Sequence, residues 1–135
     1  MLQELKINET PVRTSRNFNI NNAKLKDIDI PETIGKFENV SIIGQVTNDA
    51  DNNYNLTYGL GNELEKQIKQ DANKNLKIVI EKDINQNVEI DFNFNKQNLN
   101  LVDNIEIISK EDTKSTIIIK YKSEKDIQAY HNGII

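Results

Sequence analysis

The sequence contains no cysteine, no tryptophan and a single histidine among its 135 residues. Without cysteine, these residues supply no disulfide framework and no thiolate for zinc or an iron–sulfur cluster. Nowhere do about eighteen apolar residues run together, and the segment after Met1 to Lys6 lacks the apolar run of a signal peptide. We therefore expect a cytoplasmic protein with no cofactor of its own and no membrane segment.

Neither sign of charge predominates in the sequence. The chain has 17 basic and 21 acidic residues, a formal net charge of −4, and the two signs are interspersed. No basic stripe is present to neutralise nucleic acid phosphates, and no polybasic patch to bind anionic lipid. Nucleic acid and membrane are therefore not expected as partners.

Aliphatic residues are plentiful and unusual in kind. Leu, Ile, Val and Phe together number 40, and Ile alone outnumbers Leu by 21 to 9. This apolar content is enough for one folded domain. Because β-branched side chains favour the pleated surface of a sheet, the composition predicts a mainly β protein.

The chain divides into three segments. Residues 1–36 hold both prolines and no sustained period, so we expect an irregular N-terminal arm. Residues 37–75 predict a short strand over 37–46, a polar turn, and one packed helix over about 62–74 with Asn62 as its N-cap. Residues 76–135 predict a strand-rich region, giving an α+β protein overall.

Apolar residues alternate with polar ones after residue 76, most regularly from Val88 to Phe94. The denser runs at 105–108 and 117–119 predict strands buried on both faces. Strand segments begin near residues 76, 88, 104 and 115, a spacing that suits either the first coils of a parallel β-helix or, as the alternative, a β-sandwich.

Candidate catalytic and metal-binding patterns are incomplete. Asp49-x-Asp51-x-Asn53 begins like a calcium loop, but Tyr54 stands at the sixth position, where glycine is needed. Gly59-Leu60-Gly61 lacks the third glycine of a phosphate-binding loop. The serines form no nucleophile motif, and Glu111-Asp112 is typical of a solvated turn. We therefore expect no enzymatic activity.

The remaining motif is Tyr130-His131-Asn132-Gly133 near the C-terminal end. Asn-Gly favours a turn with positive φ, and a neighbouring histidine commonly bonds loop backbone. We interpret this motif as structural, because a lone imidazole has no second metal ligand or nucleophile in the sequence.

Three C-terminal stretches carry a family resemblance: Leu101 to Ile108, Thr116 to Tyr121, and Ala129 to Gly133. Together they resemble the SufB/SufD family of iron–sulfur cluster assembly scaffolds, in which an acidic turn and a β-branched strand precede a His-Asn-Gly run. Near the start, Pro11-x-x-Thr14 is similar to that family's N-terminal Pro-x-x-Thr-Trp motif, with Ser15 in place of the tryptophan.

The resemblance implies that the chain is the N-terminal portion of such a scaffold, with the first coils of a right-handed parallel β-helix. It also implies partners, a SufC-like ATPase and a SufB or SufD subunit, reached through the full-length protein. The alternative is an independent all-β module that binds a peptide or a sugar. In the first case the last coil exposes a strand edge, around residues 117–119 and 134–135, through which we expect self-association.

Overall fold

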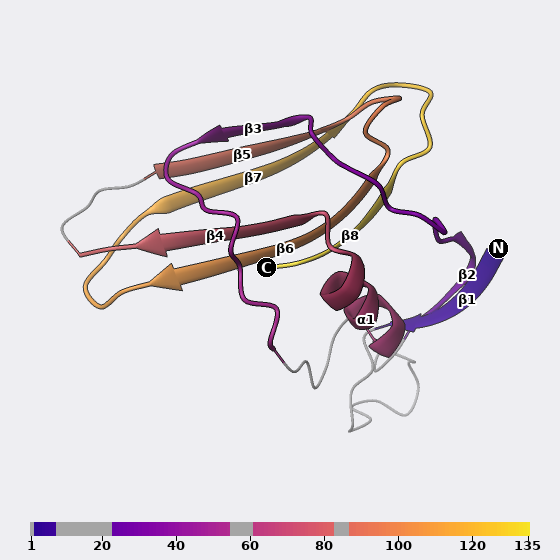
Figure 1. Cartoon of the computed structure of the whole chain (residues 1–135), viewed down its shortest axis with the longest axis horizontal. Coiled ribbons are helices and arrows are strands. Elements are labelled where there is room, and N and C mark those ends of the chain that lie inside the picture. Colours follow the sequence, from indigo (N-terminus) through magenta and orange to yellow (C-terminus); the bar gives the residue numbers. More distant parts are fainter. Residues whose placement is uncertain (1, 8–22, 55–60, 83–86) are drawn as a thin grey trace, which may run out of the picture.

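We describe the protein from a computed structural model, for residues 2–7, 23–54, 61–82 and 87–135. The described part of the chain is mainly β with one short helix (Figure 1). The elements follow one another as β1 (Leu2–Ile7), β2 (Ala23–Asp29), β3 (Val40–Ile43), α1 (Asn62–Asp71), β4 (Lys74–Ile80), β5 (Asn87–Phe94), β6 (Asn100–Ser109), β7 (Thr116–Ser123) and β8 (Tyr130–Ile134).

The N-terminal arm, which the sequence predicted to be irregular, contains two strands. β1 and β2 pair as an antiparallel two-stranded sheet whose register shifts between Gln3 and Leu5. Leu2 and Leu5 stand three positions apart, so the alternation that identifies a strand is broken at the same place. Both arginines and Pro11 lie outside the described residues.

Strands β3 to β8 form two three-stranded sheets, ordered β3-β5-β7 and β4-β6-β8. Successive strands from β4 onward fall alternately in the two sheets, and each pairs in parallel with the strand two places later. The expected strand segments are confirmed, and they do not fold back on one another as hairpins. Within the described residues, antiparallel ladders are limited to β1 with β2 and β3 with β5.

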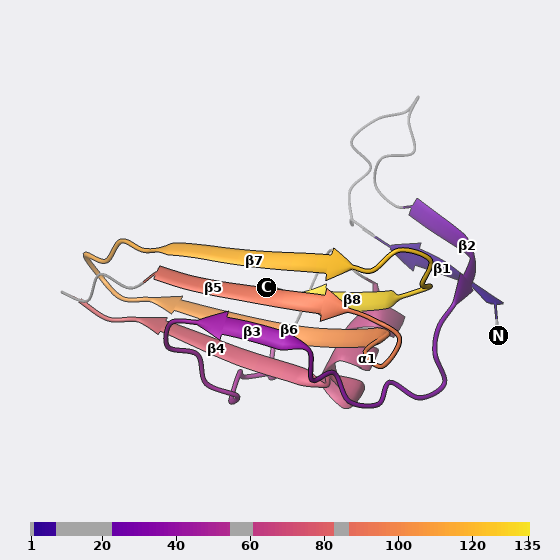
Figure 2. The ribbon, with the colours of Figure 1, turned by 90° about the horizontal axis from the view of Figure 1, so that it is seen from above.

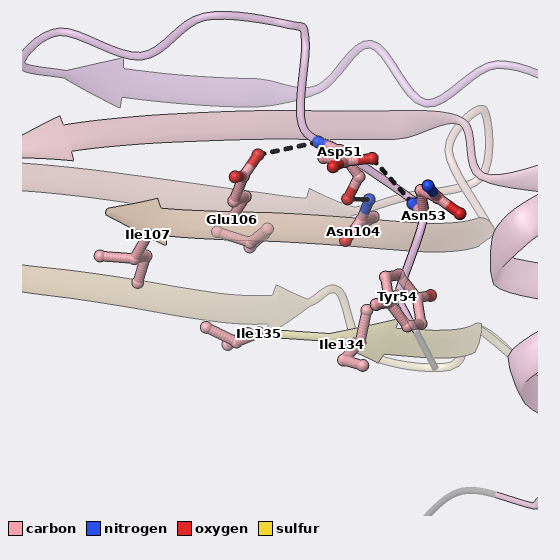
Figure 3. Close-up of a pocket in the computed structure, with 9 residues that line it drawn as sticks. Asp51, Asn53, Tyr54, Asn104, Glu106, Ile107, Ile134 and Ile135 are labelled. Carbon is pink, nitrogen blue, oxygen red and sulfur yellow. Dashed lines mark hydrogen bonds between the residues drawn. The ribbon is translucent and has the colours of Figure 1, made fainter. Parts of the chain in front are cut away.

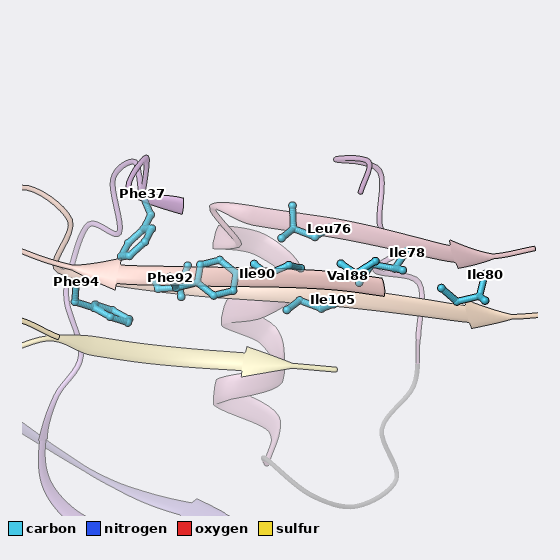
Figure 4. Packing of buried hydrophobic residues seen from close by; sticks show 10 residues of the cluster. Phe37, Leu76, Ile78, Ile80, Val88, Ile90, Phe92, Phe94 and Ile105 are labelled. Atoms are coloured by element: carbon cyan, nitrogen blue, oxygen red, sulfur yellow. The ribbon is translucent and has the colours of Figure 1, made fainter. Parts of the chain in front are cut away.

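The core lies between the two sheets (Figures 1 and 4). Alternate residues of β4 and β5 point into it, as the period of two predicts. Phe37 closes the core at one end, edge-on to Phe92 and Phe94 at centroid distances of 6.2 and 5.0 Å. The buried cluster comprises Phe37, Leu76, Ile78, Ile80, Val88, Ile90, Phe92, Phe94, Leu101 and Ile105.

The prediction that residues 105–108 and 117–119 are buried on both faces was wrong. Ile107 is 38% exposed and Ile118 is 43% exposed. The ladder of β8 with β6 stops at Asn104, so no strand lies beside Ile107 on that side in the described chain. Ile118 is on the outer face of β7, opposite in direction to the core residues Ile117 and Ile119.

The segment that leads from Phe37 to Thr47 covers one edge of both sheets (Figure 2). β3 runs antiparallel along β5, and Thr47 then exchanges two backbone hydrogen bonds with Lys77 of β4, at 3.0 and 2.8 Å. Gly44 makes the crossing between them with φ 102°, and a Cβ atom there would lie 2.7 Å from the Asn87 carbonyl oxygen. β5 therefore has a strand on both sides, and β4 has β6 on one side and the single bridge at Lys77 on the other.

The one helix of the described chain packs on the outer face of the β4-β6-β8 sheet, with Ile68 fully buried. It is shorter than predicted and ends at Asp71, because the chain is already extended at Ala72. The predicted N-cap is wrong by one residue: Gly61 is the N-cap, and the Glu65 amide donates to the Gly61 carbonyl. No side chain of the described residues caps the helix.

Candidate functional site

The Tyr130-His131-Asn132-Gly133 motif forms the first four residues of β8, in parallel register with Asn100 to Asp103 of β6. Because side chains alternate along a strand, the motif divides into two pairs. Tyr130 and Asn132 contact α1 on the outer face, and His131 and Gly133 lie against Asp103 on the inner face.

The outer pair holds β8 to the helix. The Tyr130 hydroxyl donates to Gln67 Oε1 at 2.8 Å. Asn132, which is 5% exposed, donates through Nδ2 to the Leu64 carbonyl at 3.0 Å and to Gln67 Oε1 at 2.8 Å. Burial raises the pKa of Tyr130, and its hydrogen bond to Gln67 opposes that rise. Tyr130 and Asn132 therefore have a structural role, because their hydrogen bonds hold α1 against β8.

The inner pair belongs to a polar cluster at the uncovered margin of the core, formed by the buried Asp103 and the partly exposed Tyr121 and His131. Asp103 is fully buried, and its two oxygens have different partners. The Tyr121 hydroxyl donates to Oδ2 at 2.7 Å, and His131 Nε2 lies 2.9 Å from Oδ1. The three residues come from β6, β7 and β8, so the cluster joins the two sheets through one buried carboxylate.

Aromatic rings hold the cluster from one side. Tyr121 stacks on Phe92 with centroids 5.2 Å apart and planes 9° apart, and the imidazole of His131 lies 4.4 Å from the Tyr121 ring. Phe94 meets the same imidazole edge-on at 6.3 Å. Burial raises the pKa of Tyr121 far above its ordinary value, and the neighbouring Asp103 carboxylate raises it further. Tyr121 is therefore a neutral hydrogen-bond donor.

Gly133 is not in a turn, and this corrects our interpretation of the Asn-Gly pair. It lies within β8 and is not among the glycines with positive φ, which in the described residues are Gly35, Gly44 and Gly61. A Cβ atom at Gly133 would come 1.6 Å from Asp103 Oδ1 and 2.9 Å from His131 Nε2. Glycine is required here for space beside the buried carboxylate.

Among the described residues, no serine, threonine or lysine side chain is hydrogen-bonded to His131, and no group of three or more His, Asp and Glu side chains could hold a metal. The Asp103 carboxylate orients the imidazole of His131. In this arrangement the pair fixes the position of β8 relative to β6 and β7.

The other patterns from the sequence have structural partners or lie outside the described chain. Asp51 donates its backbone amide to Glu106 and accepts the Asn104 side-chain amide at its carbonyl, so the loop is held against β6. Asn55, Gly59 and Leu60 are outside the described residues. Glu111 and Asp112 lie in the turn between β6 and β7, where Asp112 has φ 56°.

An open pocket of about 350 Å³ lies where β8 ends beside β6 (Figure 3). Its apolar side is formed by Ile105, Ile107, Ile134 and Ile135, and its polar side by the loop of Asp51 to Tyr54 with Asn104 and Glu106. The buried Tyr54 hydroxyl has no hydrogen-bond partner among the described residues, and burial, followed by the charge of Glu65, raises the pKa of Tyr54. Lys69 Nζ lies 4.9 Å from the centroid of the Tyr54 ring.

No family model, curated protein or solved structure matches this chain. The function of the site therefore has to be argued from its geometry. No helix in the described residues is long and apolar enough to cross a membrane.

Proposed function

We propose that this chain is a structural, non-catalytic N-terminal segment of a scaffold for iron–sulfur cluster assembly, similar to SufB and SufD proteins. In this proposal β4 to β8 are the first coils of a right-handed parallel β-helix in the cytoplasm. The cluster chemistry and the contacts with a SufC-like ATPase and a SufB or SufD subunit belong to the full-length protein.

The register of the strands supports the coil proposal. Asn87 pairs with Thr116 and Lys74 pairs with Asp103, a separation of 29 residues, and Asn100 pairs with Tyr130, a separation of 30 residues. A nearly constant separation is expected when each coil adds one strand to each sheet. Parallel crossovers are right-handed in nearly all proteins, so right-handed coils are expected here.

The difference between the two ends of the sheets is the observation on which the proposal rests. At one end β3, Thr47 and Phe37 cover the edges and the apolar cross-section of both sheets. At the other end β7 and β8 have no further strand beside them among the described residues. A terminal unit of a repeat protein needs one covered end and one end that continues the stack.

The polar cluster fits the same role. Asp103 draws Tyr121 and His131 together from strands of both sheets, and it thereby fixes the last coil at the uncovered end. A fully satisfied buried carboxylate specifies one arrangement of the strands around it, because a shifted register leaves the charge unpaired. This supports a positional role for the motif at residues 130–133.

Disruption of the gene in its own cell tests the proposal. We expect the activities of several iron–sulfur enzymes to fall together, while enzymes without clusters keep theirs, and the wild-type gene to restore them. A tagged copy of the native protein should also purify with an ABC-type ATPase and a cysteine desulfurase. Unchanged iron–sulfur enzyme activities in the disrupted strain would contradict the proposal.

The pocket beside Tyr54 favours a second candidate, an independent module that binds a peptide or a sugar. Four isoleucines form an apolar wall, and Asp51, Asn53 and Glu106 offer polar contacts beside it. Binding to a peptide or glycan array that is lost on Tyr54→Ala, together with normal iron–sulfur enzymes in the disrupted strain, would favour this candidate over the scaffold.

A further inference from the structure

The edge strand β7 presents an apolar inner row and an uncovered backbone. It pairs with β5 on one side only in the described chain. Its inner residues Ile117 and Ile119 are only partly buried against the core, and Tyr121 is 39% exposed. An edge of this kind accepts another strand, because its free amide and carbonyl groups are already aligned.

Charged side chains usually prevent an edge strand from pairing with another chain. On the outer face of β7 these charges have partners within the sheet. Two lysines of β7, Lys120 and Lys122, would normally repel a second positively charged strand. Lys120 is hydrogen-bonded to Glu89, and Lys122 Nζ lies 2.7 Å from Asp91 Oδ2. These bonds raise the pKa of Lys120 and lower that of Asp91, so both lysine charges are paired with carboxylates of β5.

The sequence of β7 is complementary to itself in the antiparallel register centred on Ile119. When Ile119 faces Ile119 of a second strand, Ile117 faces Tyr121, and both pairs lie on the inner side. On the outer side the same register places Ile118 opposite Lys120, whose aliphatic stem can cover it. A shift by one residue would place the lysines of one strand opposite the inner isoleucines of the other. The core contacts of Ile117 and Ile119 therefore fix which residues of β7 face the inner side of the dimer.

We propose that a second copy of this chain docks on β7, antiparallel, about a twofold axis at Ile119. The contact is isologous, so it closes as a dimer and leaves no repeated β7 edge to extend into a fibre. This inference does not rest on the proposed function, since it follows from the edge strand of the described chain alone. In the proposed full-length scaffold the next coil would occupy the same edge, so the dimer is a property of the 135-residue chain. It predicts that Ile117 and Tyr121 become buried in the dimer.

Analytical ultracentrifugation of the 135-residue chain over a concentration series tests the association. We expect a reversible species of twice the 15.5 kDa mass of one chain. Ile118→Lys, which faces Lys120 of the other copy, should raise the dissociation constant by roughly tenfold, whereas Ile118→Glu should not. Ile43→Lys is the control, because Ile43 is 64% exposed on β3 at the covered end.

Cysteine crosslinking tests the register, since the chain has no cysteine of its own. Ile119→Cys should form a disulfide-linked dimer under mild oxidation, because directly opposed residues lie within disulfide reach. Ile117→Cys, on the same face of the same strand, should not. A strict monomer at every concentration would overturn the proposal, and equal crosslinking of the two variants would overturn the register and with it the docking mode.

Discussion

Gly133 of β8 lies directly beside Asp103 of β6 in the parallel ladder, and a single added methyl group at Gly133 would overlap the Asp103 carboxylate at 1.6 Å. The same carboxylate receives Tyr121 from the other sheet and His131 from two residues earlier in β8. The small size of Gly133 therefore permits a buried carboxylate in β6 with side-chain partners in two other strands, β7 and β8.

Gly133→Ala should destabilise the protein by about 1–3 kcal/mol, because either β8 or the Asp103 side chain must move. Urea unfolding followed by circular dichroism measures this change. The control is the same substitution in an Asp103→Ala background, where the obstructing oxygen is gone. There we expect little or no cost, so a double-mutant cycle should give a large coupling energy. An additive cycle would show that the two residues do not interact.

Tyr121→Phe should lower the free energy of unfolding by about 1.5–3 kcal/mol, since it removes a hydrogen bond to a charged, buried group. The ring that stacks on Phe92 is retained, so packing changes little. Tyr130→Phe is the matched control: it removes a bond to the neutral amide of Gln67 and should cost about 0.5–1.5 kcal/mol. Equal losses in the two variants would contradict the stronger hydrogen bond assigned to Tyr121 and Asp103.

The strands themselves were predictable because β5 alternates without interruption from Val88 to Phe94, and β4 alternates from Leu76 to Ile80 except at Val79. Sequence alone did not determine their parallel pairing, which depends on residues 29 positions apart that share no chemical likeness, such as Lys74 and Asp103. The strands β1 and β2 were missed because each has its partner far along the chain and a broken alternation.

The site was only half predictable. His131 and Gly133 were singled out, but as parts of a turn, and neither Asp103 nor Tyr121 was connected with them. One available signal was the alternation Leu101-x-Asp103-x-Ile105, which places an acidic residue on the inner, apolar face of a strand. A buried carboxylate needs donors, but which donors reach it depends on the stacking of three strands.

The free energy of unfolding at high pH should depend on Tyr121. Its pKa is raised in the folded protein, so above pH of about 10 the unfolded chain loses the phenolic proton while the folded chain keeps it. The contribution of Tyr121 is therefore complete below that pH and falls as pH rises further. We expect the difference in unfolding free energy between wild type and Tyr121→Phe to shrink above pH of about 10, measured by urea titrations. A constant difference would contradict this assignment.

Asn132 is the link between β8 and α1, and Asn132→Leu tests how strongly it holds the helix. The substitution keeps a buried side chain of similar size but removes both donated hydrogen bonds, to the Leu64 carbonyl and to Gln67. At about 0.5–1.5 kcal/mol for each bond, the free energy of unfolding should fall by about 1–3 kcal/mol. Because the lost partners are on α1, its amides should exchange with solvent faster than those of β5, as measured by hydrogen–deuterium exchange. Asn87→Leu, at an exposed strand position, is the control and should change stability by no more than about 0.5 kcal/mol. If the exchange of α1 and β5 accelerates equally, the helix is held by Ile68 and the sheet rather than by Asn132.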